Sequence, residues 1–394
     1  MPAPSSNPQV RISPRGAARL KSGHVWIYRS DVTASDSIPP GALVTVKDQR
    51  GKSLGTALYS SSSQIAIRML SDDSVTDLRA LLRDRIARAI AYRQSMFRDT
   101  DAYRLIFSEA DFLPGLIVDR YNSILSVQIL TQAMDSNLTR EAVISELAEQ
   151  VKPAAIVERV DPRVRELENL PPRPSGLLQG TKTSTIFTMN GVQFQFDALE
   201  GQKTGAFLDQ RENYAAATAY SHGEALDVFC YQGGFALHLA PYCSGVTGVD
   251  SSRPALEVAD QNARLNKREI EWIEANAFDL LKDYAGSHRL YDIIVLDPPA
   301  FAKNKRDLDS AIRGYKELNL RALKMLRPGG ILVTCSCSYH VGQADFLAML
   351  ASAALDSHRR LRLIEVRGQA RDHPILLNVP ETSYLKCVIA SVSA

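Results

Sequence analysis

The sequence predicts an α/β protein: a C-terminal doubly wound sheet preceded by a small β-barrel and a middle α+β domain. Residues 225–229 are an apolar strand, followed by Gly233-Gly234 and the start of a helix. A second apolar strand, 246–250, ends in Asp250. Strands and helices then alternate to the end of the chain, which is typical of a mostly parallel, Rossmann-like sheet with helices on both faces.

The barrel is expected within residues 1–72. A proline-rich tail over 1–8 precedes segments with strand character at 25–28, 42–46, 53–59 and 64–69, separated by turn residues. A short basic helix is expected at 15–21, and Trp26 is expected in the barrel core. Nine Lys and Arg stand against four Asp and no Glu in residues 1–72. This excess suggests a polyanionic partner, although a solvated basic face explains the charge equally well.

The middle domain is assigned to residues 73–188. Apolar spacing predicts helices at 78–98 and 139–151. Strands are expected within 103–132 and at 155–159, and a hairpin over 186–198 turns through Asn190-Gly191, a strong turn signal. The arginines along the first helix are expected to form a solvated face.

The last domain, residues 189–394, holds the alternating elements. Helices are expected at 254–266, 315–326 and 344–355, and strands at 270–275, 291–297, 331–337, 360–366 and 384–390. A turn at 327–330 is expected to end the helix 315–326. Ligands of such sheets gather at the carboxyl ends of the strands. Five polar side chains fall at those ends: Asp227, Asp250, Asn276, Asp297 and Cys335.

The glycine turn and Asp250 indicate a nucleoside cofactor. Glycines let the backbone approach a ligand closely, and a carboxylate at the tip of the next strand can accept hydrogen bonds from ribose hydroxyls. The turn lacks the full G-x-G-x-x-G pattern, so nothing here requires a pyrophosphate. S-adenosylmethionine, which has a ribose and no phosphate, fits better than a dinucleotide.

A rigid Asp297-Pro-Pro-Ala-Phe301 turn follows the strand 291–297. Its prolines donate no N–H groups, so carbonyls there can accept from an exocyclic amine. Asp297 can hold or protonate a ring nitrogen. Turns of this kind occur in methyltransferases that act on amines of adenine or guanine, so the motif indicates an amino-bearing base without choosing the methylated atom.

The strand 331–337 ends in Thr334-Cys-Ser-Cys-Ser338, next to that turn. A thiolate there could add to C6 of a pyrimidine and make C5 nucleophilic enough to accept a methyl group. Buried strand cysteines are common, but the position beside Asp297 favours catalysis. Cys335 and Cys337 share a face of the strand, so spacing does not choose between them.

A dense polar cluster precedes the sheet at 201–211. Its Lys203, Thr204, Asp209, Gln210 and Arg211 would suit a lid over the amino-acid part of the cofactor. Arg211 could hold a carboxylate with two hydrogen bonds. An ordinary capped helix start is the alternative.

Composition excludes several other classes. Five cysteines in 394 residues do not make a disulfide framework, and no metal-ligand spacing is present. The N-terminus does not resemble a signal peptide, and no stretch reaches the roughly 18 apolar residues of a membrane span. A soluble cytoplasmic protein without membrane contact is expected. The oligomeric state stays open, with a homodimer as one candidate.

Together these motifs resemble those of the RlmI family, the large-subunit rRNA cytosine-5 methyltransferases. The motifs on which the resemblance rests lie at residues 203–211, 229–235, 297–301 and 334–338. The resemblance covers nearly the whole chain and implies an RNA-binding PUA domain, a middle domain and a class I methyltransferase domain. It also implies S-adenosylmethionine as donor, 23S rRNA cytosine as acceptor, and Cys335 as nucleophile with Cys337 as the fallback.

The chain departs from the family pattern at two places. Cys230 and Gln232 stand where Ser and Thr are expected, and Ala300 stands where Lys is frequent. The second departure bears on the target base, since that side chain would face the substrate.

The candidate site follows from these arguments. The catalytic candidates are Cys335, Asp297 and Cys337. The cofactor-binding candidates are Lys203, Thr204, Phe207, Asp209, Gln210, Arg211, Asp227, Phe229, Cys230, Gly233, Gly234, Asp250, Ser251, Asn276, Ala277, Asp297 and Pro298. The substrate-binding candidates are Pro298, Pro299, Phe301, Arg15 and Lys21. Two alternatives remain: an N-methyltransferase acting on an adenine or guanine amine, and an RNA-binding ribosome-assembly factor with a vestigial cofactor site.

Overall fold

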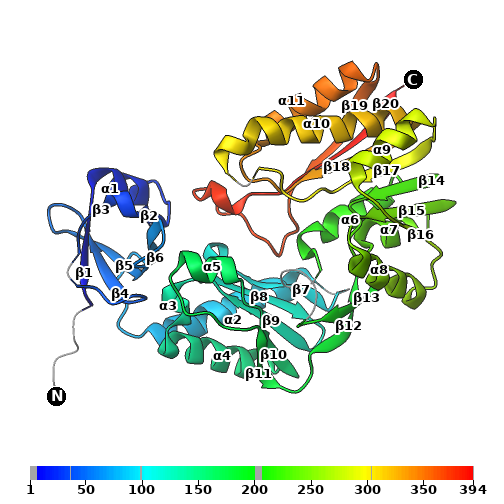
Figure 1. Ribbon diagram of the computed structural model, residues 1–394. Coiled ribbons are helices and arrows are strands. Elements are labelled where there is room, and N and C mark those ends of the chain that lie inside the picture. Colours follow the sequence, from blue (N-terminus) through cyan, green and yellow to red (C-terminus); the bar gives the residue numbers. More distant parts are fainter. Residues whose placement is uncertain (1–6, 36, 98–99, 200–205, 303, 394) are drawn as a thin grey trace. The chain divides into compact units, whose positions relative to one another are not determined.

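The computed structural model describes residues 7–35, 37–97, 100–199, 206–302 and 304–393 (Figure 1). Their contacts define two compact units. Unit 1 is built from Met1–Phe187, Phe196–Gly205 and Asp372–Thr382. Unit 2 is built from Thr188–Gln195, Ala206–Arg371 and Ser383–Ala394. The chain therefore passes from one unit to the other several times.

Unit 1 begins with a six-stranded sheet in the order β2-β6-β5-β4-β1-β3. Its elements are β1 Gln9–Ile12, α1 Pro14–Lys21, β2 Trp26–Tyr28, β3 Val32–Ser35, β4 Leu43–Lys47, β5 Ser53–Tyr59 and β6 Ile65–Ser71. The helix starts where it does because the Ser13 side chain accepts from Gly16 N and Pro14 occupies its first turn. β1 and β3, which sequence reasoning did not assign, pair with each other antiparallel, and β1 also pairs with β4.

A second, five-stranded sheet in unit 1 has the order β11-β10-β9-β8-β7. Its elements are α2 Leu78–Met96, β7 Ala102–Phe107, β8 Leu116–Tyr121, β9 Ile124–Ile129, α3 Gln132–Asp135, α4 Asn137–Val151, β10 Ala155–Glu158, α5 Pro162–Leu167 and β11 Gly176–Gly180. Leu58 and Leu70 of the first sheet belong to the same buried cluster as Leu82 and Ile86 of α2. The two sheets therefore share a hydrophobic core.

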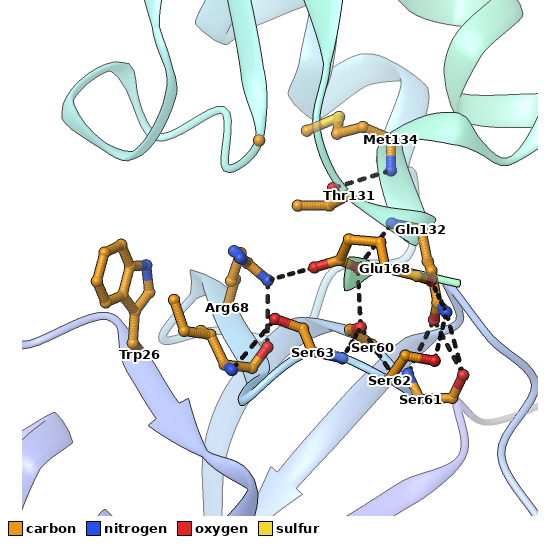
Figure 2. Close-up of polar contacts among 12 residues, drawn as sticks. Trp26, Ser60, Ser61, Ser62, Ser63, Arg68, Thr131, Gln132, Met134 and Glu168 are labelled. Carbon is orange, nitrogen blue, oxygen red and sulfur yellow. Dashed lines mark hydrogen bonds and ion pairs between the residues drawn. The ribbon is translucent and has the colours of Figure 1, made fainter. Parts of the chain in front are cut away.

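Polar contacts reinforce the junction between these two sheets (Figure 2). Glu168, which is buried, accepts from Ser60 Oγ at 2.8 Å and lies 3.6 Å from Arg68 Nη1. Arg68 also lies 3.4 Å from Glu109. The Trp26 indole N–H donates to Glu109 at 2.9 Å. Trp26 was expected in the barrel core. It is instead half-buried, and its indole bonds to Glu109 in the turn between β7 and β8.

A hairpin connects the two units along the chain, formed by β12 Ser184–Met189 and β13 Val192–Asp197. Asn190 and Gly191 have φ values of 52° and 78°. Two consecutive positive φ values define the tight turn that an Asn-Gly pair predicts.

Unit 2 is a seven-stranded sheet in the order β16-β15-β14-β17-β18-β20-β19. Its elements are α6 Arg211–Thr218, β14 Glu224–Val228, α7 Gly234–Leu239, β15 Gly245–Asp250, α8 Arg253–Leu265, β16 Glu271–Glu274, α9 Ala277–Gly286, β17 Tyr291–Leu296, α10 Leu308–Met325, β18 Leu326–Ser336, α11 Gln343–Asp356, β19 Arg360–Arg367 and β20 Lys386–Ser393. The strands from β16 to β18 run parallel, and β20 and β19 close the sheet antiparallel.

Helices cover both faces of this sheet (Figure 1). Because side chains alternate along a strand, neighbouring residues of β14 contact helices on opposite faces. Leu226 and Val228 of β14 join the core cluster that α9, α10 and α11 cover. Asp227 between them points to the other face, where its Oδ2 accepts from Ala236 N of α7. The expected doubly wound arrangement is confirmed.

One region differs from expectation. α10 begins at Leu308 instead of residue 315, and Gly314 lets it approach the Phe301 ring closely. The expected turn at 327–330 lies inside β18. Tyr291 pairs with Leu326 and Ile293 with Ile331, so the Pro-Gly-Gly segment forms an irregularity within the strand. No described helix is long and apolar enough to cross a membrane.

Candidate active site

The turn after β14 is built from strained backbone. Phe229 and Tyr231 have φ values of 68° and 49°, unusual for residues other than glycine, and Gly233 has 85°. The N–H groups of Phe229 and Cys230 both bond to Val249 O, at 2.8 and 3.0 Å, which fixes the turn against β15. Strain of this kind persists where the surroundings over-determine the conformation, as they do here.

The glycines in this turn are required by close packing. A Cβ at Gly234 would lie 2.5 Å from Tyr214 Oη. Beside them is a small cavity of about 30 Å³ whose lining includes Phe207, Phe229, Cys230 and Asp297. The Phe207 and Tyr231 rings meet edge to face at 5.1 Å on its wall.

Asp250 holds the turn from the neighbouring strand. Its Oδ2 accepts from Tyr231 N and its Oδ1 from Ser252 N, each at 2.9 Å. Each carboxylate oxygen can accept a further hydrogen bond, so ribose hydroxyls could be held there as well. Ser251 is exposed beside it.

Asp227 and Asn276 act on the helices that follow their strands. Asp227 is fully buried, and burial raises its pKa to about 8. Nearby Asp297 and Asp250 raise the pKa further, against the hydrogen bond from Ala236 N. Asn276 is exposed and caps α9 by accepting from Phe278 N at 2.9 Å, while Ala277 is buried.

The polar segment before α6 reaches the end of β17. Gln210 Nε2 donates to Asp297 Oδ1 at 2.9 Å, and Asp209 Oδ2 accepts from Tyr384 Oη at 2.7 Å. Arg211 is buried at the start of α6. Lys203 and Thr204, the other residues expected in the lid, lie outside the described residues.

Asp297 is half-buried at the end of β17. Burial and the charge of Asp209 raise its pKa to about 7, against the hydrogen bond from Gln210. Pro298 is buried and Pro299 exposed. The Phe301 ring is half-buried and packs on Tyr315 at a centroid distance of 4.7 Å.

The two strand cysteines have different surroundings. Cys335 has no exposed surface and sits opposite Cys387 on β20. Burial, Cys387 and Asp297 all raise the pKa of the Cys335 thiol well above its usual value. Cys337 lies just past β18 and is partly exposed, with Sγ 3.9 Å from Pro298 O.

Arg15 and Lys21 lie on α1 in unit 1, and both are exposed. Arg15 Nε donates to the buried Asp31 at 2.8 Å. Sequence reasoning missed Tyr214, Tyr384 and Lys386 in unit 2. Lys386 could have been recognised from the sequence, because it is the one charged residue in the otherwise apolar stretch 385–390.

Comparisons with known proteins agree with this geometry. Residues 10–72 match the model of the PUA-like domain, and residues 117–375 match that of the S-adenosylmethionine-dependent methyltransferase family. "Ribosomal RNA large subunit methyltransferase I" of Shewanella amazonensis is 38% identical over 395 residues, covering 98% of this chain and 99% of that protein. The protein of the same name from Shewanella frigidimarina is 37% identical, with the same coverage. The chain belongs to the ribosomal RNA large subunit methyltransferase I family.

The fold of this family member also resembles solved structures. A methyltransferase complexed with SAH, SMU.776, superposes with a TM-score of 0.84 at 19% identity, covering 98% of this chain and 100% of that chain. A methyltransferase from Streptococcus mutans gives 0.82 at 18% identity, with the same coverage. The expected fold class, family and cofactor are confirmed.

S-adenosylmethionine is therefore the cofactor, and the residues present fit it. The glycine turn has no room for a Cβ at Gly234, and Asp297 is among the residues that line the cavity beside it. Asp250 lies at the tip of the adjacent strand, where a ribose would be held.

Proposed function

We propose that this enzyme methylates C5 of a cytosine in 23S rRNA, through a covalent adduct with Cys337. One observation carries the proposal: the sulfur of the partly exposed Cys337 lies 3.9 Å from the carbonyl oxygen of Pro298, the residue directly after Asp297. A nucleophile and a group that can hold a base thus meet at the ends of two adjacent parallel strands, β17 and β18. The name of the relatives supports large-subunit ribosomal RNA as the acceptor.

The family resemblance favoured Cys335 as the nucleophile. The exposure of the two side chains favours Cys337 instead. A nucleophile must reach its substrate and react as a thiolate. Cys335 has no exposed surface, and its thiol pKa is well above the usual value. Its position opposite Cys387 fits a packing role between β18 and β20.

The chemistry then follows from the side chains. The Cys337 thiolate adds to C6 of the cytosine, and Asp297, whose pKa is near 7, can donate a proton to the ring nitrogen that becomes electron-rich. The bound cofactor supplies a methyl group on a sulfonium. After C5 is methylated, a water molecule acting as base takes the C5 proton and the C6–sulfur bond breaks to expel the thiolate. The ring nitrogen returns its proton to Asp297, which restores the aromatic ring, Asp297 and Cys337.

The target cytosine must leave its stack to reach these strand ends. The exposed Arg15 and Lys21 are proposed to hold RNA phosphates, leaving selectivity to the shape of the folded RNA. Such a substrate implies a cytoplasmic enzyme. Light scattering of the purified enzyme measures its molar mass in solution and so tests the homodimer.

Trapping with RNA that contains 5-fluorocytosine tests the proposal, because fluorine at C5 cannot leave as a proton and the adduct persists. We expect a covalent complex that maps to Cys337, is kept by Cys335→Ala and is lost in Cys337→Ala. Methylated nucleosides are identified by mass spectrometry. Full activity of Cys337→Ala, with methyl groups on adenine or guanine amines, would establish the N-methyltransferase alternative instead.

A further inference from the structure

Lys386 is a buried lysine in the otherwise apolar stretch 385–390, at the start of β20. It is 8% exposed and pairs with Ser336 across β18 and β20. Its Nζ donates to the carbonyls of Ser338 at 2.6 Å and Tyr384 at 2.8 Å. Within the described residues it forms no ion pair with a carboxylate. A buried charge without a counter-charge is costly, so this position calls for an anionic partner.

The Cys337 thiol can supply such an anion when it loses its proton. Burial lowers the pKa of Lys386 to about 8, and charge on Cys337 acts in the opposite direction. The ammonium has three N–H donors, of which two are used on the carbonyls. One of those carbonyls belongs to Ser338, the residue directly after Cys337.

The backbone around the thiol is fixed from both sides. Ser338 Oγ accepts from Ala302 N at 3.2 Å and lies 2.9 Å from Tyr315 Oη. Lys386 holds the carbonyl of the same residue from β20. Ser338, the residue directly after Cys337, is therefore anchored through both its hydroxyl and its carbonyl, which restricts where the Cys337 sulfur can point.

We propose that Lys386 is a positioning residue that holds Cys337 as a thiolate and fixes its direction toward the target base. The inference rests on the proposed function and deepens it. The thiol proton of Cys337 goes to solvent, and the thiolate and ammonium remain as a pair. When the sulfur adds to C6 its negative charge is lost, and when the adduct breaks down the departing thiolate regains its cationic neighbour. Nearby positive charge lowers a thiol pKa and so eases both steps.

The test measures the reactivity of Cys337 in the full chain without RNA. The rate of alkylation by iodoacetamide is followed from pH 5 to 10, and the modified peptide is identified by mass spectrometry. Lys386→Met should raise the apparent pKa of Cys337 by at least about one unit and slow its alkylation at pH 7 roughly tenfold. Lys386→Arg should restore most of the rate.

Lys316→Met is the matched control, because Lys316 lies on α10 and pairs with Asp356 at 2.7 Å. It should leave the alkylation of Cys337 unchanged. Calorimetric binding of S-adenosylmethionine shows that each variant is folded. Equal profiles for Lys386→Met and the parent, or no rescue by arginine, would overturn the proposal. If Lys386→Met does not fold, an ordinary pKa of about 8.5 for Cys337 in the parent enzyme overturns it as well.

The outcome separates this inference from the proposed function. If the parent enzyme forms the 5-fluorocytosine adduct but Lys386→Met leaves Cys337 equally reactive, the lysine has no such role and the function stands. If Lys386→Met shifts the thiol pKa but the parent enzyme forms no adduct, the ion pair stands and the covalent function fails.

Discussion

Gln210 Nε2 donates a hydrogen bond of 2.9 Å to Asp297 Oδ1 and so joins the segment before α6 to the end of β17. The same glutamine accepts from Asn213 Nδ2 at 2.7 Å, which fixes the orientation of its amide. The bond favours the charged carboxylate and therefore lowers the pKa of Asp297, which burial has raised to about 7.

Gln210→Ala should move the alkaline limb of the methylation rate to higher pH. Loss of the hydrogen bond raises the pKa of Asp297 further, so its protonated form persists to higher pH. The pH–rate profile measures this shift. A limb that stays in place or moves to lower pH would show that protonated Asp297 does not act in the reaction.

Asp227→Asn should change how stability depends on pH. The folded pKa of Asp227 is raised to about 8, so the wild-type carboxyl stabilises the fold below its unfolded pKa of about 4 and that contribution is lost as the pH rises through 8. Relative to wild type, the variant should therefore gain stability between pH 5 and pH 8, by up to about 4 kcal/mol. Denaturant unfolding at both pH values gives the comparison. Parallel curves would mean that Asp227 does not titrate differently in the folded and unfolded states.

Gly234→Ala should weaken binding of S-adenosylmethionine by tenfold or more. The new Cβ would meet Tyr214 Oη at 2.5 Å, and overpacking of this kind costs about 1–3 kcal/mol. Gly286→Ala is the control, because its Cβ would meet nothing within 4 Å. Calorimetric titration measures both affinities, and equal losses for the two variants would refute a specific role for the glycine turn.

Cys335→Ala should lower stability by about 1 kcal/mol while leaving adduct formation intact, since it removes a buried sulfur from the β18–β20 pair. Cys387→Ala, its register partner, should behave alike. Thermal unfolding and the 5-fluorocytosine trap are the two measurements. Loss of the adduct in a folded Cys335→Ala protein would show that Cys335, and not Cys337, is the nucleophile.

Arg93→Met should destabilise unit 1 by about 3–5 kcal/mol, because it leaves the carboxylate of Asp111 without its cation. Arg93 has no exposed side-chain surface and also donates to Asp372 O at 2.8 Å. Arg88→Met, which breaks the exposed pair with Asp84, should cost less than 1 kcal/mol. Similar unfolding midpoints for the two variants would contradict this difference.

Much of unit 2 could be predicted from the sequence because its signals are local. The glycine turn, the acid at the end of β15 and the Asp-Pro-Pro turn each lie within a few residues of their strand. The extent of α10 was missed, since its first residues contain Asp, Ser and Gly, and their helical state depends on packing against Phe301.

The difference between Cys335 and Cys337 could not be predicted. The two residues are two positions apart at the end of β18, a spacing that places them on one face in an ideal strand. Their exposure depends on where β18 ends and on its neighbour β20. In the sequence, β20 follows β18 only after α11, β19 and the segment 372–382. The neighbours Cys387 and Lys386 come from that distant strand.

The path of the chain between β19 and β20 limits how this enzyme can be divided. Residues 372–382 belong to unit 1, where Asp372 accepts from Arg104 N at 2.9 Å and Glu381 contacts His24 at 3.2 Å. The strand that carries Lys386 comes directly after them. A methyltransferase fragment cut at a single point would therefore carry a segment that folds with the other unit. An exchange of unit 1 between relatives would therefore have to transfer residues 372–382 with it.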